Sequence, residues 1–266
     1  MKGYIKEILK VDAPLTENKN LLREYLQKYI LFLIYKNNFY TEITFTGGSA
    51  LRFLYQLRRF SEDLDFSLSK NACKYDFVIF LDTIKRELYL AGYEVEITYN
   101  IEKNVNNALI KFLNLLYEFK LSEIKGEKFT IKIEVDTLPP EGGREITSLY
   151  NSDFIFEIKH FDIPSLFAGK IHALLCRKFN RGRDYYDLLW YLTKFKNLEP
   201  NIDMLKNAVM QTCIKKINIK KFNWRELVRE KIKTLDFTDI RKDIISLLEV
   251  PEEVKLITRE NFLKLL

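Results

Sequence analysis

A glycine pair, a short helix and two aspartates follow one another in a single stretch of this chain, and they constrain its fold more than any other feature. Gly47 and Gly48 permit a tight turn, and Ser49 is placed to cap the helix that it opens, in which apolar residues recur at helical spacing. Asp63 and Asp65 then alternate with apolar residues, as on a half-buried strand. The two carboxylates therefore point to the same side of that strand.

The carboxylates of Asp63 and Asp65 indicate a metal site. Side by side they repel each other unless a cation lies between them, and Mg²⁺ or Mn²⁺ suits such oxygen ligands and brings substrate phosphates with it. A third carboxylate is expected where one metal activates an attacking oxygen. Glu134, on a later alternating strand, is the predicted third ligand, and Asp136 on the same face is its alternate.

Candidate phosphate-binding groups come from two regions of the sequence. Gly48 and Ser49 open a helix, where free backbone N–H groups and the positive helix end attract phosphates. Lys170 and Arg177 are seven residues apart on a predicted helix and fall on nearly the same face. There they would bind a triphosphate, Lys170 through the point charge of its ammonium and Arg177 through its planar, forked guanidinium.

Other charged residues near these groups are less decisive. Arg52 either reaches the phosphates or pairs with Glu62. Asp184 is predicted to orient Lys170 or the acceptor, which makes it a candidate catalytic residue. A structural role is predicted for Asp187, since Arg183 and Asp187 have the spacing of a helix ion pair.

Strand-like alternation recurs before residue 162, whereas helical spacing continues from Pro164 to the end. We therefore predict an α+β fold, with a catalytic domain over residues 1–162 and a helical domain over residues 163–266 that completes the active site. The predicted strands are 42–45, 64–68, 93–100, 129–137 and 154–160, and the predicted early helices are 17–37, 71–91 and the one from 49, with 105–119 ambiguous between helix and strand.

Charge is unevenly spread along the chain. Residues 1–162 have a net charge of −2, whereas residues 163–266 carry 21 Lys and Arg against 13 Asp and Glu, a net of +8. Such a basic half could attract a nucleic acid. The densest cluster and its flanking aromatics, which could stack on unpaired bases, are Lys215, Lys216, Lys220, Lys221, Phe222 and Trp224. The alternative is a charged loop between helices with the aromatics in the core.

Several classes of protein are disfavoured. Cys73, Cys176 and Cys213 lie far apart in sequence, which predicts buried, reduced thiols and a cytoplasmic protein. Two histidines and three scattered cysteines lack the spacing of a zinc site. No run of about 18 apolar residues occurs, so no membrane span is expected.

Three segments of the chain resemble one family. TGGSALRFLYQLRRFSEDLDFSL is similar to the first motif of the AbiEii-type nucleotidyltransferases, within the DNA polymerase beta-like superfamily. FAGKIHALLCRKFNRGRDYYDLLWYL resembles that family's later motif, and IKIEVD fits the strand between them. The resemblance covers roughly residues 44–192. It implies a polymerase beta-like sheet with helices, followed by a helical half.

The resemblance also implies an activity. A metal-dependent transfer of a nucleoside monophosphate from an NTP to an acceptor is expected, with tRNA-like RNA as the acceptor. Members include toxins of toxin–antitoxin systems that prevent phage growth, so a cognate antitoxin is an expected partner. Two alternatives stay open: transfer to a small alcohol such as an aminoglycoside, and a non-catalytic member that binds nucleotide or RNA. Asp63, Asp65 and Lys170 are all present, which favours an enzyme.

Overall fold

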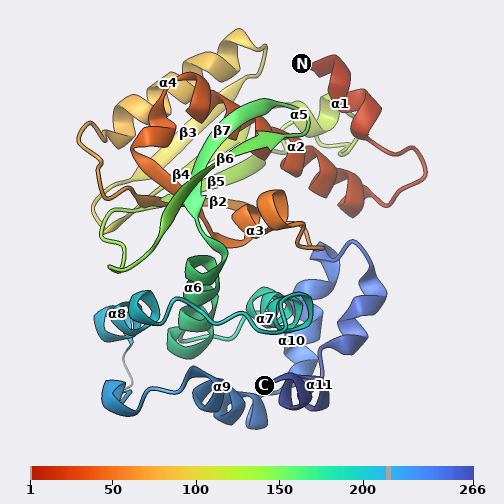
Figure 1. The fold of residues 1–266 in the computed structure, drawn as a ribbon. Coiled ribbons are helices and arrows are strands. Elements are labelled where there is room, and N and C mark those ends of the chain that lie inside the picture. The colour runs from red at the N-terminus through yellow and green to blue at the C-terminus, as the bar shows by residue number, and fades with distance from the viewer. Residues whose placement is uncertain (1, 214–216) are drawn as a thin grey trace. The chain divides into compact units, whose positions relative to one another are not determined.

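The computed structural model describes residues 2–213 and 217–266 and has the predicted α+β architecture (Figure 1). Its strands are β1 (Ile43–Thr46), β2 (Asp63–Leu68), β3 (Val95–Asn100), β4 (Val105–Phe112), β5 (Phe129–Asp136), β6 (Glu145–Asn151) and β7 (Ile155–Phe161). Its helices are α1 (Lys2–Ile8), α2 (Leu15–Lys36), α3 (Gly47–Tyr55), α4 (Phe77–Leu90), α5 (Leu115–Glu118), α6 (Ile163–Cys176), α7 (Gly182–Lys194), α8 (Ile202–Thr212), α9 (Trp224–Lys233), α10 (Phe237–Ile244) and α11 (Arg259–Leu265). The 3₁₀ turns are η1 (Phe39–Thr41), η2 (Ile219–Lys221), η3 (Ile245–Leu247) and η4 (Pro251–Leu256). None of the helices within the described ranges has the length and apolar character that a membrane crossing requires.

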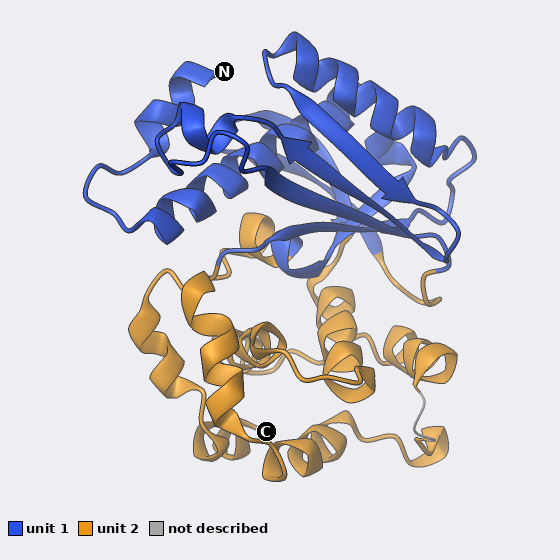
Figure 2. Ribbon diagram, turned by 180° about the vertical axis from the view of Figure 1, so that it is seen from behind, with its two compact units in different colours: residues 1–50, 60–138, 145–160 blue, residues 51–59, 139–144, 161–266 orange. Residues whose placement is uncertain are grey.

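Contacts divide the chain into two compact units that each draw on separate parts of the sequence (Figure 2). Unit 1 comprises Met1–Ala50, Phe60–Leu138 and Glu145–His160, and unit 2 comprises Leu51–Arg59, Pro139–Arg144 and Phe161–Leu266. The domain boundary near residue 162 stays a prediction. The structure adds that two earlier segments group with the helical half, and that the division passes through α3.

Unit 1 is built around a mixed sheet, which has seven strands in the described part of the chain, in the order β3-β4-β5-β2-β1-β7-β6. Strand β2 pairs antiparallel with β1 and parallel with β5. One face of the sheet is apolar, with Phe45, Phe66 and Val135 all buried. Helix α2 packs on this face, where Phe32 meets Phe156 of β7 at 6.4 Å between ring centroids. Helix α4 packs against α2 and β3 (Figure 1).

The predicted helix over 71–91 begins six residues later than expected. Asp76 caps α4 by accepting hydrogen bonds from the backbone N–H groups of Val78 and Ile79, at 2.9 and 3.0 Å. An aspartate at this position satisfies N–H groups that have no partner within the helix, and so fixes the start. Gly92, with φ +87°, follows the helix in the left-handed region that glycine tolerates.

The ambiguous segment 105–119 contains both predicted structures. Its first part is β4, which alternates between buried and less buried side chains, and α5 follows it. Strand β6 was not predicted, and its residues are mostly partly or fully exposed without the regular alternation of β5. A strand of this kind gives little signal in the sequence, because alternation reports burial on one face.

Unit 2 is helical after Phe161, as predicted. Asp162 caps α6 by accepting a hydrogen bond from the Ser165 N–H at 3.0 Å, and Pro164 lies in the first turn. The core includes the rings of Phe167 and Tyr191, which stack with centroids 4.3 Å apart. The Trp224 ring packs edge-on against Phe167 at 5.4 Å.

The prediction of buried, reduced cysteines is wrong. Cys176 and Cys213 are joined by a disulfide in unit 2, and both are half-buried. Cys73 is free and exposed. The two paired residues are 37 positions apart in sequence, and the ends of α6 and α8 bring them together. Spacing alone does not reveal such a pair.

Candidate active site

Strand pairing brings the predicted carboxylates of unit 1 together. In the parallel register of β2 and β5, Asp65 lies opposite Glu134, and Asp63 lies opposite Lys132. Asp63, Asp65 and Glu134 are all partly exposed, and they alternate with buried residues, so they share the face opposite the apolar one. This face of unit 1 is acidic at β2 and β5.

Gly47 holds the first turn of α3 against Asp65. Its φ is +74°, a left-handed conformation, and a Cβ atom built on it would overlap the Asp65 carboxylate. The carboxylate therefore lies at the positive N-terminal end of α3, next to the turn that Gly48 and Ser49 continue. The glycine pair predicts a tight turn at Gly47, but it does not reveal this approach to Asp65.

Ser49 is fully buried, and its hydroxyl donates a hydrogen bond to the backbone carbonyl of Asp63. The helix begins two residues earlier than predicted, at Gly47, so Ser49 does not cap it. The amide of Gln27 on α2 donates to the Ser61 carbonyl at 3.1 Å. These bonds fix the start of β2 relative to α3 and α2, and therefore the position of Asp63.

The two candidates for the third carboxylate have different surroundings. Glu134 forms a 2.7 Å ion pair with Lys132 on the same strand. Asp136 lies opposite Ser67 in the register and accepts a hydrogen bond from the Leu138 N–H at 3.0 Å. Burial raises the pKa of the Asp136 carboxyl, against the lowering effect of that bond. The register places Glu134, not Asp136, directly beside Asp65.

The donor set tests whether a metal ion fits. Within the described residues, no group of three or more His, Cys, Asp or Glu side chains is arranged to hold a metal ion as it stands. Asp63 and Asp65 supply carboxylate oxygens on one strand face, which is the ligand type that Mg²⁺ prefers. Glu134 would have to leave Lys132 to join them. The pair fits a divalent cation, and the third ligand stays a prediction.

Unit 2 gathers other predicted residues in a charge cluster centred on Asp187. The Arg59 guanidinium donates two hydrogen bonds to the Asp187 carboxylate, at 2.6 and 2.7 Å, and Lys170 Nζ lies 2.7 Å from it. Arg59 is 1% exposed and Asp187 is 0% exposed. Burial alone would raise the pKa of the Asp187 carboxyl, but the charges of Arg59 and Lys170 outweigh it and hold that pKa below its ordinary value.

Asp184 links this cluster to Arg177. Arg177 donates a 2.5 Å hydrogen bond to Asp184, and Lys170 Nζ lies 3.8 Å from the same carboxylate. Arg177 is not on the helix face predicted, because α6 ends at Cys176 and Arg177 has extended backbone. It nevertheless shares a carboxylate with Lys170. Asp187 pairs with Arg59 and Lys170, and its predicted pairing with Arg183 stays a prediction.

Arg52 on α3 has partners within unit 2. Its guanidinium lies 2.8 Å from Glu249 and donates to the Leu57 carbonyl at 3.1 Å. Its predicted contact with phosphates stays a prediction.

The predicted nucleic-acid surface is partly overturned. Trp224 is 3% exposed, and its indole N–H donates to Glu199 at 2.7 Å, so it cannot stack on unpaired bases. Lys220 and Lys221 are exposed on η2. Lys215 and Lys216 lie outside the described residues. For Trp224 the alternative prediction, an aromatic in the core, is confirmed.

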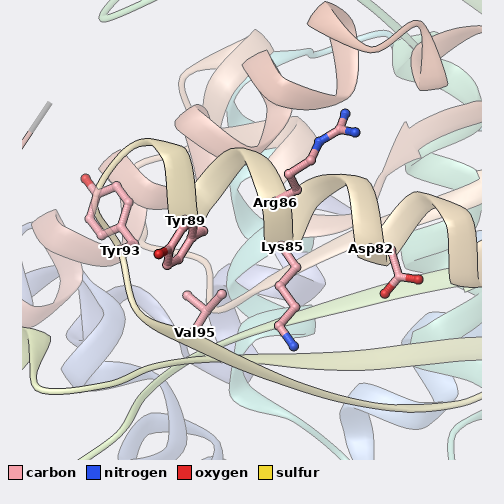
Figure 3. A pocket seen from close by; sticks show the side chains of 6 residues that line it. All are labelled: Asp82, Lys85, Arg86, Tyr89, Tyr93 and Val95. Carbon is pink, nitrogen blue, oxygen red and sulfur yellow. The ribbon is translucent and has the colours of Figure 1, made fainter.

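A hollow of about 270 Å³ on unit 1 lies between α4 and the start of β3 (Figure 3). Lys85 and Tyr89 of α4 line it together with Val95, whereas Arg86 extends away from Lys85. No predicted site residue lines it, so it is not part of the candidate active site.

Comparisons with known proteins identify a family and a fold. A family model described as "Nucleotidyl transferase AbiEii toxin, Type IV TA system" matches residues 29–258. A solved structure of a proposed nucleotidyltransferase from H. pylori is 18% identical, with a TM-score of 0.55 over 92% of this chain and 90% of that chain. The structure of JHP933 from Helicobacter pylori is also 18% identical, with a TM-score of 0.51 over 92% and 91% of the two chains. No protein of curated function matches the chain.

Proposed function

This chain belongs to the AbiEii family of nucleotidyltransferase toxins and is a nucleotidyltransferase, and we propose that it transfers a nucleoside monophosphate from an NTP to a hydroxyl of tRNA-like RNA. The observation that carries the proposal is the placement of Asp65, which lies beside Glu134 in the sheet register and against Gly47 at the positive end of α3. An acidic strand face next to a phosphate-binding helix end suits the charge of an NTP with its cation.

Asp63 and Asp65 would hold Mg²⁺ or Mn²⁺, which would neutralise phosphate charge and polarise the attacking oxygen. The backbone N–H groups of Gly48 and Ser49 would bind a phosphate oxygen at the N-terminal turn of α3, which would have to open for this because both residues are buried. The acceptor hydroxyl oxygen forms a bond to the α-phosphorus, the bond from that phosphorus to the bridging oxygen breaks, and pyrophosphate leaves. Glu134, once released from Lys132, accepts the hydroxyl proton.

We assign phosphate binding in unit 2 to Lys170 and Arg177. Their cluster contains three cations, with Arg59, and two carboxylates, Asp184 and Asp187, so it retains a net positive charge. Lys170 is held by Asp187 and is 12% exposed, whereas Arg177 is 43% exposed. Fixed cations of this kind lose little freedom when they bind phosphate. Asp184 orients both cations, and Arg52 is an additional predicted phosphate contact.

The acceptor and the biological setting are further parts of the proposal. The net charge of +8 over residues 163–266 supports a polyanionic acceptor rather than a small alcohol such as an aminoglycoside. Family membership supports a toxin that acts in the cytoplasm, in phage defence, and is countered by a cognate antitoxin. A non-catalytic role is disfavoured because Asp63, Asp65 and Lys170 are all in place.

The test is incubation with each labelled NTP and total cellular RNA, with and without a chelator, followed by gel separation. We expect label on small RNA only when divalent cation is present. Asp63→Ala and Asp65→Ala should each lower transfer by several powers of ten, because charge stabilisation at the reacting phosphate is worth several kcal/mol. Glu157→Ala, on the exposed side of β7, is a matched acidic control that should retain wild-type turnover. Label on a small molecule or on protein would reject RNA as the acceptor, and full turnover in the Asp63 or Asp65 variant would reject the site.

A further inference from the structure

Unit 2 contains a pocket of about 420 Å³ that none of the predicted site residues lines. Its walls come from α7, η4, α11 and Arg58. All the lining residues belong to unit 2, so the pocket is defined by this unit alone. Its volume lies in the range of pockets that bind small molecules.

One wall of the pocket is apolar. Trp190 lines it with the small part of its surface that is exposed, 8%, and is held by edge-to-face contacts with Tyr191 and Phe195, at 5.0 and 5.4 Å between ring centroids. Lys194 Nζ lies over the Trp190 ring, 5.0 Å from its centroid, and adds a cation beside it. Leu189 and Leu256 continue the apolar surface, and Leu256 is 53% exposed at the rim. A fixed indole beside two leucines suits a planar ring.

A second wall holds polar groups that satisfy one another. The Arg58 guanidinium lies 3.0 Å from Glu253, and the Tyr186 hydroxyl donates to Glu253 at 2.5 Å. Burial, followed by the bond to Glu253, raises the pKa of the Tyr186 phenol above its ordinary value, so the phenol stays protonated. Glu253 is therefore already paired and does not oppose an anionic ligand as a free carboxylate would.

The pocket also presents donors without partners. Lys264 is exposed, and among the residues that the structure describes it forms no ion pair or hydrogen bond. The Trp190 indole N–H likewise has no hydrogen-bond partner within residues 2–213 and 217–266. With Arg58 and Lys264 against Glu253, the lining has a net charge of +1. A ligand here would be anionic as well as planar.

We propose that this pocket binds a single nucleotide, with the base against Trp190 and the phosphate beside Lys264. A nucleotide combines a flat ring with a negative group at a size that the volume accommodates, and stacking on an aromatic ring tolerates any base. The same chemistry has two sources: a free nucleoside monophosphate, or an unpaired residue of a nucleic acid strand. The binding does not depend on the transfer reaction proposed above.

The test is calorimetric titration of the full chain in EDTA with AMP, GMP, CMP and UMP, and separately with a short single-stranded oligoribonucleotide. We expect saturable binding, weakened about tenfold by Lys264→Ala, the loss of one charged contact. Leu256→Glu should abolish it, because this exposed position accepts a charge without disturbing the core. Lys242→Ala on α10 replaces a comparable exposed cation outside the pocket and should bind as wild type.

The two sets of titrations distinguish a free nucleotide from a nucleic acid strand as the ligand. Binding of monophosphates identifies the free nucleotide, and binding of the oligonucleotide alone, weakened by the same two variants, identifies a strand. No binding of any probe at millimolar concentration, or equal affinity in wild type and both variants, overturns the proposal. Because EDTA removes divalent cation and no transfer is measured, either result leaves the proposed catalytic function to its own test.

Discussion

Gly47 is the residue at which the first turn of α3, the proposed phosphate-binding turn, approaches Asp65 of the acidic strand most closely. We expect Gly47→Ala to abolish transfer and to lower the free energy of unfolding by roughly 1–3 kcal/mol, because alanine is strained at φ +74° and its Cβ would displace the Asp65 carboxylate. Urea denaturation and the labelled-NTP assay measure the two effects. Gly126→Ala is the control, since a Cβ atom there would meet nothing within 4 Å. Unchanged transfer by Gly47→Ala would mean that the close approach has no part in catalysis.

Asp187 is a buried carboxylate that is paired with two cations. Asp187→Asn would leave Arg59 and Lys170 without their shared anion, and breaking such a buried pair costs about 3–5 kcal/mol. The folded-state pKa of Asp187 is depressed. Its contribution is therefore fully present above the ordinary value of about 4, and it is lost as the pH falls through the folded pKa.

The difference in unfolding free energy between wild type and Asp187→Asn should thus stay constant near neutral pH and shrink only below about pH 4. Urea denaturation over a series of pH values measures it. Asp239→Asn, an exposed aspartate on α10, should track wild type throughout. A difference that persists undiminished in acid would show that the aspartate acts through packing rather than charge.

At the scale of elements, the sequence predicts what periodicity can report. The alternation of β2 predicts correctly that Asp63 and Asp65 share a face, and the alternation of β5 predicts correctly that Glu134 and Asp136 do, because a strand has a period of two. Alternation cannot report which strand lies beside which. That Asp65 lies next to Glu134 is known only from the pairing register of β2 and β5. The start of α4 was misplaced because the capping bonds of Asp76 outweigh apolar spacing in the residues before it.

The disulfide is an element-scale feature that sequence spacing does not predict. It joins the ends of α6 and α8 across 37 positions, and closing a loop of that size stabilises the folded state by about 2–4 kcal/mol. We expect Cys213→Ser, or reduction by dithiothreitol, to lower the Tm of the oxidised protein by several degrees. Cys73→Ser should leave Tm unchanged, because Cys73 is free and exposed. An identical Tm with and without reductant would show that the pair is reduced in solution.

At the scale of the whole molecule, the predicted site residues are distributed over two compact units. Unit 1 provides Asp63, Asp65 and Glu134, and unit 2 provides Lys170 and Asp184. The sequence indicated this distribution through the change from alternation to helical spacing. It could not indicate that Arg59 would be the partner of Asp187. The two residues are 128 positions apart, and helical or strand periodicity relates only residues within one element.

The basic half of the chain leads to a prediction about the acceptor. Cations that bind a polyanion release its counterions, so affinity falls as salt rises, and the slope reports the number of phosphate contacts. Lys220 and Lys221 are the members of the predicted cluster that the structure describes, and both are exposed. We expect Lys220→Gln with Lys221→Gln to flatten the slope of log K against log salt for tRNA by about 1.4–1.8, at roughly 0.7–0.9 per contact.

Filter binding over a salt series measures this slope. The matched control is Lys103→Gln with Lys125→Gln, which removes the same charge from exposed positions of unit 1. Because both double variants have the same net charge, a general electrostatic effect would flatten the two slopes equally, whereas a phosphate-contacting surface on unit 2 flattens only one. Equal slopes in all three proteins would remove Lys220 and Lys221 from the RNA surface. Weak binding with no salt dependence in the wild type would favour a small alcohol as the acceptor, since a neutral or cationic acceptor releases no counterions.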